Sequence, residues 1–199
     1  LDFLGNLIYW LAYVILKLYF KIIHRLDIKG KENRPNEGPL IIMANHISAF
    51  DPPIVGIIMR RKVHFMAKEE LFKNPIMGKM LRAIGTFPVK RVKPDRSALR
   101  ESFRLLDEDE VICIFPEGTR SKTGKLAKAK AGAILIALKS KSPILPVAIK
   151  RKENSLKFKI SIGEKFTLEQ YYDKKLSRDQ RKEVGKYIMK KIEDEIESI

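Results

Sequence analysis

Six short runs of apolar residues, rich in Ile, Val and Phe, recur through the chain and constrain its fold more than any other feature. Runs of this length and composition are typical of buried strands, and the stretches between them carry the periodicity of helices. The pattern therefore predicts an α/β domain with a mixed, mostly helix-covered β-sheet. The predicted strands are residues 40–44, 63–67, 86–90, 111–115, 144–149 and 158–162.

Three helices are predicted in the same part of the chain. One covers residues 97–106 after the potential N-cap Asp95, and a second covers residues 126–138. Near the end, apolar residues recur every four positions and indicate an amphipathic helix: Val184, Ile188, Ile192 and Ile196.

The segment from Phe3 to about Ile23 is the least soluble part of the sequence, with fourteen consecutive uncharged residues from Phe3 to Leu16. As a helix this segment is about 30 Å long, enough to cross a bilayer. Polar or aromatic side chains nevertheless form one stripe along it, at Asn6, Trp10, Tyr13, Lys17, Lys21 and His24. Such a stripe indicates a helix that lies in the membrane interface, with His24 at the membrane-facing rim. A helix that spans the membrane, or one that packs on the core of a soluble protein, remains an alternative. We therefore expect a hydrophobic membrane-attachment helix in residues 1–26 and the α/β domain in residues 27–199.

The chain is strongly basic, with 40 Lys and Arg residues against 24 Asp and Glu and a formal net charge of +16. Such a charge attracts acidic lipid headgroups, phosphates or nucleic acid. Nucleic-acid readers interleave exposed aromatic residues with Lys and Arg, whereas the aromatic residues here concentrate near the N-terminus. We expect anionic membrane lipids as partners and no nucleic acid.

The single cysteine, Cys113, lies within an apolar run and has no second cysteine for an intramolecular disulfide. This cysteine usage fits a reducing environment. Together with the N-terminal segment it predicts a peripheral or monotopic protein on the cytoplasmic side of the cell membrane.

The most informative stretch is residues 41–53, where an apolar strand ends and His46 follows. Asp51 comes five residues later, directly before two prolines. Pro52 at a first helical position makes Asp51 a potential N-cap, so the turn between strand and helix brings His46 and Asp51 together. An imidazole held by a carboxylate takes a proton from an attacking hydroxyl. No serine or cysteine stands in an obvious nucleophile setting, so we expect the hydroxyl to belong to the substrate, with Ser48 as the one alternative.

A second polar cluster follows the predicted strand 111–115, in the sequence Phe-Pro-Glu-Gly-Thr-Arg-Ser. Gly118 allows close approach to the backbone, and Arg120 offers a planar fork for phosphate. Glu117 and Thr119 have groups that orient a hydroxyl or hold the arginine. Strand ends gather at one edge of such sheets, so the two clusters predict one shared site.

These residues resemble the glycerolipid acyltransferase family, whose members carry Asn-His, four residues and Asp, followed later by Phe-Pro-Glu-Gly-Thr-Arg. Four family blocks stand here in order, at residues 45–51, 85–91, 115–120 and 145–147. In the second block Gly85, Phe87 and Arg91 take the expected places. Pro88 departs from the family pattern and predicts an edge strand or bent loop.

The resemblance implies that His46 is the general base and Asp51 its orienting partner, with no acyl-enzyme intermediate. It further implies that Glu117 holds the glycerol moiety or positions Arg120. The residues expected to bind substrate are Glu117, Gly118, Thr119, Arg120, Arg91 and Lys68.

The same resemblance implies a lysophosphatidate acceptor, an acyl thioester on CoA or acyl-carrier protein as donor, and phosphatidate as product. Another acceptor, such as glycerol-3-phosphate or a different lysolipid, remains an alternative, as does a non-catalytic basic membrane-binding module. No group of His, Cys and acidic residues has metal-ligand spacing, and no glycine-rich phosphate loop is present. We therefore expect no metal and no bound cofactor.

Overall fold

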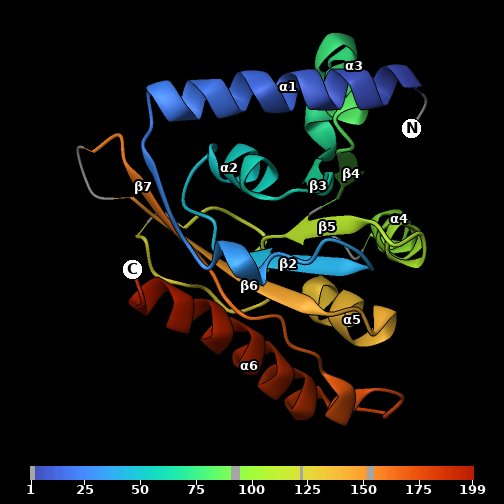
Figure 1. The fold of residues 1–199 in the computed structure, drawn as a ribbon. Coiled ribbons are helices and arrows are strands. Elements are labelled where there is room, and N and C mark those ends of the chain that lie inside the picture. Colours follow the sequence, from blue (N-terminus) through green and yellow to red (C-terminus); the bar gives the residue numbers. More distant parts are fainter. Residues whose placement is uncertain (1–2, 91–94, 122, 152–154) are drawn as a thin grey trace.

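The computed structural model describes residues 3–90, 95–121, 123–151 and 155–199 (Figure 1). In this part of the chain one sheet holds the strands in the order β1-β7-β6-β2-β5-β3-β4. β6 and β7 are antiparallel and the other described pairs are parallel, which confirms the predicted mixed sheet. The strands are β1 (Leu26–Lys29), β2 (Leu40–Ala44), β3 (Val63–Lys68), β4 (Phe87–Val89), β5 (Val111–Ile114), β6 (Ile144–Arg151) and β7 (Phe158–Ile162).

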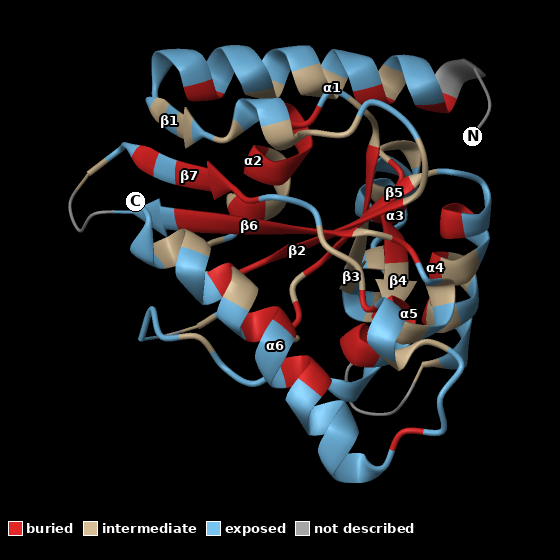
Figure 2. Ribbon diagram, turned by 60° about the horizontal axis from the view of Figure 1, so that its bottom comes forward, coloured by how far each residue is buried: buried red, intermediate tan, exposed pale blue. Residues whose placement is uncertain are grey.

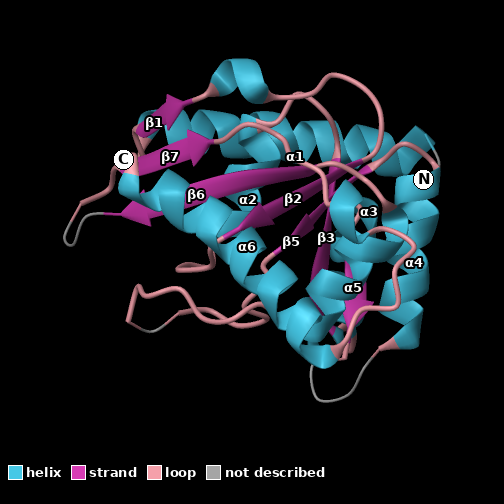
Figure 3. Ribbon diagram, turned by 90° about the horizontal axis from the view of Figure 1, so that it is seen from below, coloured by secondary structure: helices cyan, strands magenta, loops and turns pink. Residues whose placement is uncertain are grey.

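Helices cover both faces of this sheet (Figures 1 and 3). They are α1 (Phe3–Ile22), α2 (Asp51–Ile58), α3 (Pro75–Ala83), α4 (Arg96–Asp107), α5 (Ala131–Ser140) and α6 (Arg178–Glu197), with the short 3-10 helices η1 (Lys31–Asn33), η2 (Glu69–Phe72) and η3 (Glu169–Tyr171).

The central strand β2 shows how the two hydrophobic cores arise. All five of its residues are buried, because both faces of the strand are covered. Ile41 and Met43 pack with α4, α5 and α6 on one face. Leu40 and Ile42 pack with α1 and α2 on the other. The long apolar runs of the sequence are therefore the strands buried on both sides.

The six predicted strands are all present, to within two residues at each end. Phe87–Val89 forms the last strand of the sheet, as Pro88 predicts for an edge. Asp95 caps α4 by accepting hydrogen bonds from the backbone N–H groups of Ser97 and Ala98. The predicted start of the helix at residues 126–138 is wrong, because α5 begins at Ala131. Residues 126–130 are not helical, since backbone N–H groups in that segment bond to the neighbouring loop.

Helix α1 packs one side against α2 and leaves the other side exposed (Figure 2). Tyr9 and Phe20 are buried on the inner side. None of the described helices is long and apolar enough to cross a membrane. The expected rim position of His24 is wrong: the side chain is buried, its Nδ1 lies 2.8 Å from the carbonyl oxygen of Leu156, and its ring lies 5.3 Å from that of Phe50.

Another buried histidine, His64, stands near the start of β3, which lies between β5 and β4. Its Nδ1 lies 3.0 Å from the carbonyl oxygen of Gly85, and its Nε2 lies 3.5 Å from a Glu110 carboxylate oxygen. Burial lowers the pKa of His64 below its ordinary value, and the nearby Glu110 opposes this only in part. Folding therefore favours the neutral form of this imidazole.

The free energy of unfolding is expected to fall as the pH drops below the ordinary histidine value. The unfolded chain binds a proton at His64 more readily than the folded chain does, so acid favours unfolding. Urea unfolding at about pH 7.5 and about pH 5.5 measures the difference. His64→Gln is expected to show a smaller pH dependence, and an unchanged dependence would assign the effect to other groups.

Candidate active site

The turn from β2 to α2 brings His46 and Asp51 into direct contact. The Nδ1 atom of His46 lies 2.7 Å from Oδ2 of Asp51. Asp51 is fully buried and His46 is only 8% exposed. Because Nδ1–H donates to the carboxylate, Nε2 carries the lone pair and is the ring atom that can accept a proton.

Asp51 does not cap α2 in the way the sequence predicts. The helix begins at Asp51 itself, with Phe50 as the N-cap residue and no side-chain cap. The Oδ2 atom instead accepts hydrogen bonds from the backbone N–H groups of Ile47 and Ser48, each at 2.7 Å. These donors fold the turn around the carboxylate and hold it in place for the histidine. Oδ1 is buried and has no hydrogen-bond partner among the described residues.

Two further residues fix the histidine in place. Asn45 bonds through its side chain to the backbone N–H and carbonyl of Ile149, at 2.7 and 2.8 Å, and so ties the end of β2 to β6. The ring of Phe115 stacks on the imidazole with centroids 4.2 Å apart. Both residues belong to the family blocks, but their roles depend on contacts with Ile149 and His46 that the sequence does not predict.

Glu117 lies beneath the site and is only 1% exposed. One carboxylate oxygen accepts from the backbone N–H of His46 at 3.0 Å, and the other accepts from that of Ala127 at 2.9 Å. The backbone N–H of Ser121 also donates to the His46 carbonyl at 2.7 Å. In the described structure Glu117 therefore holds three backbone segments together, and the expected contact with Arg120 is not formed.

A single cleft gathers most of the predicted substrate-binding residues around His46. Its lining includes Lys68, Gly118, Thr119 and Arg120, which come from the end of β3 and the loop after β5. Glu117 is buried and is not among the residues that line this cleft. Arg91 lies outside the described residues.

Gly118 has a backbone conformation that explains its residue type. Its φ of 70° is one that side chains other than hydrogen disfavour, and an added Cβ would lie 3.1 Å from Cγ of Lys130. The loop can therefore turn tightly beside the cleft only with glycine here.

Comparison with known proteins agrees with this geometry. A family model described as Acyltransferase matches residues 25–150. The chain belongs to the acyltransferase family. Within the family it is 34% identical to the 1-acyl-sn-glycerol-3-phosphate acyltransferase of Bacillus subtilis (strain 168) over 156 residues, which are 75% of the chain and 77% of the relative.

Other members of the acyltransferase family match as well. The chain is 32% identical over 142 residues to the chloroplastic 1-acyl-sn-glycerol-3-phosphate acyltransferase BAT2 of Brassica napus, covering 68% of the chain and 41% of that relative. A crystal structure of the 1-acyl-sn-glycerophosphate (LPA) acyltransferase PlsC from Thermotoga maritima is similar with a TM-score of 0.70 at 26% identity. The similarity covers 92% of the chain and 78% of the solved chain.

Proposed function

We propose that the chain transfers an acyl group from a thioester to the 2-hydroxyl of 1-acylglycerol-3-phosphate, giving phosphatidate. The contact that carries this proposal is the 2.7 Å bond from His46 to Asp51 at a cleft that also holds Arg120. The names of the relatives from Bacillus subtilis and Brassica napus support the choice of acceptor.

In the proposed reaction, Nε2 of His46 takes the proton from the 2-hydroxyl as its oxygen attacks the thioester carbonyl carbon. The carbon–sulfur bond then breaks and the electron pair leaves on sulfur. The protonated His46 returns its proton to that sulfur, which releases a thiol and regenerates the neutral imidazole. Asp51 stabilises the imidazolium between the two proton transfers.

The acceptor phosphate fits the cationic side chains of the cleft. Arg120 and Lys68 are both exposed and both line it. A guanidinium offers paired N–H groups to two phosphate oxygens, while an ammonium acts as a point charge. Arg120 is therefore the residue proposed to orient the phosphate, with Lys68 adding charge.

A product assay tests the reaction. The purified protein is incubated on anionic vesicles with lysophosphatidate and acyl-CoA or acyl-carrier protein, and the lipids are followed by mass spectrometry. Formation of phosphatidate supports the proposal. If product forms only with glycerol-3-phosphate or another lysolipid, the proposed acceptor is wrong but the chain is still an acyltransferase. If no acceptor gives product, both the acceptor and the proposed activity are contradicted.

For the donor, we propose that an acidic acyl-carrier protein binds along the far part of the cleft. The cleft extends along α5 to the start of α6, where Lys139, Lys174 and Lys175 line it. These three lysines are exposed and have no ion-pair partner among the described residues. Unpaired cations beside a catalytic cleft attract an acidic protein and raise its association rate.

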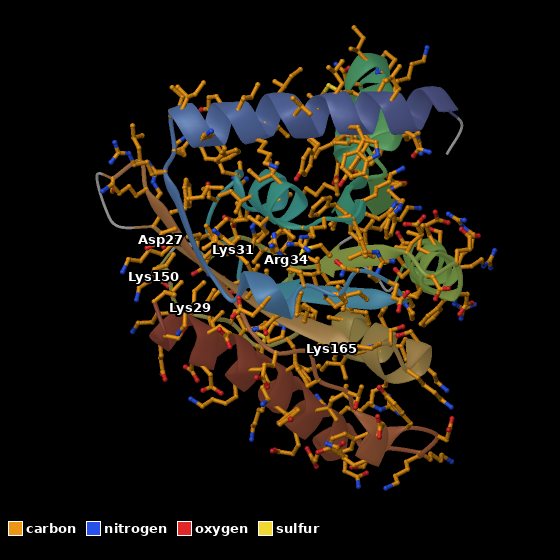
Figure 4. All side chains as sticks on the ribbon, viewed as in Figure 1. Asp27, Lys29, Lys31, Arg34, Lys150 and Lys165 are labelled. Atoms are coloured by element: carbon orange, nitrogen blue, oxygen red, sulfur yellow. The ribbon has the colours of Figure 1, made fainter. Side chains whose placement is uncertain are left out.

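Reversing these charges is expected to slow transfer from the carrier protein. The triple variant Lys139→Glu, Lys174→Glu, Lys175→Glu should lower the carrier-dependent kcat/KM by about tenfold at low salt, with a smaller effect at high salt. A matched triple variant reverses Lys29, Lys31 and Lys165, which are exposed basic residues outside this cleft (Figure 4). Equal losses in the two variants would show that net charge alone matters.

We also propose that the protein works at a membrane surface on the cytoplasmic side. Nine large apolar or aromatic side chains of α1 and the residue after it are exposed: Leu7, Trp10, Leu11, Val14, Ile15, Leu18, Tyr19, Ile22 and Ile23. Such an apolar helix face with Lys17 and Lys21 near one end fits the interface of an anionic membrane. The lipid acceptor then reaches the cleft without leaving the bilayer surface.

A further inference from the structure

Helix α3 presents an unusual amount of apolar side chain to the outside. Ile76 is 81% exposed, and Met77 and Met80 are 40% and 49% exposed. Leu71, in η2 just before the helix, is 48% exposed. Of the residues of α3, all of which the structure describes, only Gly78 is buried. Packing within the domain therefore does not account for the apolar residues of α3.

The position of α3 is well defined despite its exposure. Asn74 caps the helix by accepting from the backbone N–H groups of Ile76 and Met77. Gly78 lies so close to the backbone of Phe72 that an added Cβ would be 2.8 Å from the Phe72 carbonyl oxygen. Arg82 covers the ring of Phe72 from 5.0 Å. The helix is thus held against η2 with Ile76 and the two methionines on its outside.

Helix α3 also lies against α1, beside the N-terminal half of that helix in the view of Figure 1. The exposed side chains of α3 and of α1 are therefore neighbouring apolar surfaces on the same side of the sheet. Neighbouring exposed apolar side chains of this kind mark interaction sites on protein surfaces.

The charges around these apolar residues favour a lipid surface as the occupant. Lys73, Lys79 and Arg82 flank the apolar side of α3, all exposed and without an ion-pair partner among the described residues. Exposed cations beside inserted apolar groups are attracted to anionic headgroups. Glu69 and Glu70 in η2 are the acidic residues near this group, and Glu69 is paired with Lys90 at 3.7 Å.

The apolar surface of α3 is continuous with the candidate active site. Leu71 is exposed beside α3 and also lines the cleft that contains His46 and Lys68. A lipid tail lying against α3 would therefore meet Leu71, which is also part of the cleft lining. A second copy of the chain on this face would instead cover Leu71.

We propose that α3 is a second lipid-binding element, which inserts Ile76, Met77 and Met80 into an anionic bilayer beside α1 and places the mouth of the cleft at headgroup level. This inference rests on the proposed function at a membrane and deepens it, because attachment no longer depends on the N-terminal helix alone. The protein then contacts the bilayer through two neighbouring elements, which restricts its orientation as well as its depth.

The single tryptophan of the chain makes insertion measurable. In the wild type, Trp10 reports α1; in the double variant Trp10→Phe, Ile76→Trp, the only tryptophan reports α3. Each protein is added to phosphatidylglycerol-containing vesicles with or without brominated acyl chains, which quench tryptophan on contact. Quenching of both reporters is the expected result. Quenching of Trp10 without quenching at position 76 would overturn the role of α3 and leave the acyltransferase proposal standing.

A second set of variants tests whether α3 contributes to binding. The triple variant Ile76→Thr, Met77→Gln, Met80→Gln is expected to weaken vesicle partitioning by about tenfold or more, because polar groups replace apolar ones of similar size. The control Ile76→Val, Met77→Leu, Met80→Leu keeps the surface apolar and should bind as the wild type does.

Activity and oligomeric state complete the test. The polar triple variant should lose turnover of long-chain lysophosphatidate in vesicles but keep turnover of a short-chain, water-soluble lysophosphatidate, since His46 and its cleft are untouched. Unchanged partitioning together with a shift from dimer to monomer in size-exclusion chromatography would overturn the proposal and make α3 a contact between two copies. Loss of turnover on both substrates would also overturn it, because the effect would then lie in the fold or the site.

Discussion

Replacing His46 by alanine is expected to lower kcat/KM for acyl transfer by about a thousandfold or more, because the variant lacks the group that takes the proton from the attacking hydroxyl. Initial rates of phosphatidate formation measure the loss. Vesicle binding should not change, since His46 lies in the cleft and not on the apolar outer side of α1.

The loss in His46→Ala has to be separated from a loss of structure. Phe115 stacks on the imidazole, so thermal unfolding of the variant should be compared with that of Phe115→Leu, which removes the same stacking contact and keeps the base. A folded His46→Ala protein with a rate within about tenfold of the wild type would contradict the assignment of His46 as general base.

Glu117→Gln is expected to lower both the stability and the turnover of the protein. The carboxylate accepts from the backbone N–H groups of His46 and Ala127, and a glutamine amide offers an oxygen to only one of them. A buried N–H group without an acceptor costs about 1–3 kcal/mol. Because His46 is one of the two partners, the imidazole is displaced and kcat falls, by about tenfold or more, without a matching rise in KM.

The same change at an exposed glutamate gives the control. Glu164→Gln removes a charge from a surface position and should leave the free energy of unfolding and kcat unchanged. Urea unfolding and steady-state kinetics are measured on both variants. A Glu117→Gln protein of normal stability whose KM for the lipid alone rises would instead favour the direct glycerol contact that the family resemblance implies.

The central part of the fold could be predicted because its strands are buried on both sides and read as continuous apolar runs. β1 was missed for the opposite reason: in Leu26–Lys29 only alternate residues are half-buried, and the strand is short and lies at the edge. The start of α5 was placed too early because residues 126–130 have helical composition. The backbone N–H groups of Ala127 and Lys130 donate to Glu117 and Pro116 instead. The periodicity of the sequence does not indicate such hydrogen-bond partners.

The sequence predicts which residues form the site, but it does not predict which groups each side chain contacts. His46 and Asp51 lie close in sequence, so one short turn brings them together. For Glu117 the sequence gives a polar residue in a loop, which suggests a ligand contact, whereas the structure buries it under the turn that carries His46. Whether a polar side chain points into a cleft or beneath it depends on backbone donors supplied by distant segments.

The pairing of β1 with β7 has a consequence for how the chain is made. Leu26 pairs with Phe158, and the buried Phe20 of α1 also contacts Phe158, at 6.4 Å between ring centroids. Helices α2 and α3 contact α1 and follow soon after it in the chain, whereas Phe158 is translated much later. Until Phe158 has been translated, the buried Phe20 lacks its contact with β7. Pairing of β1 with β7 is thus expected to complete the packing of α1 late in folding, after α1 has met α2 and α3.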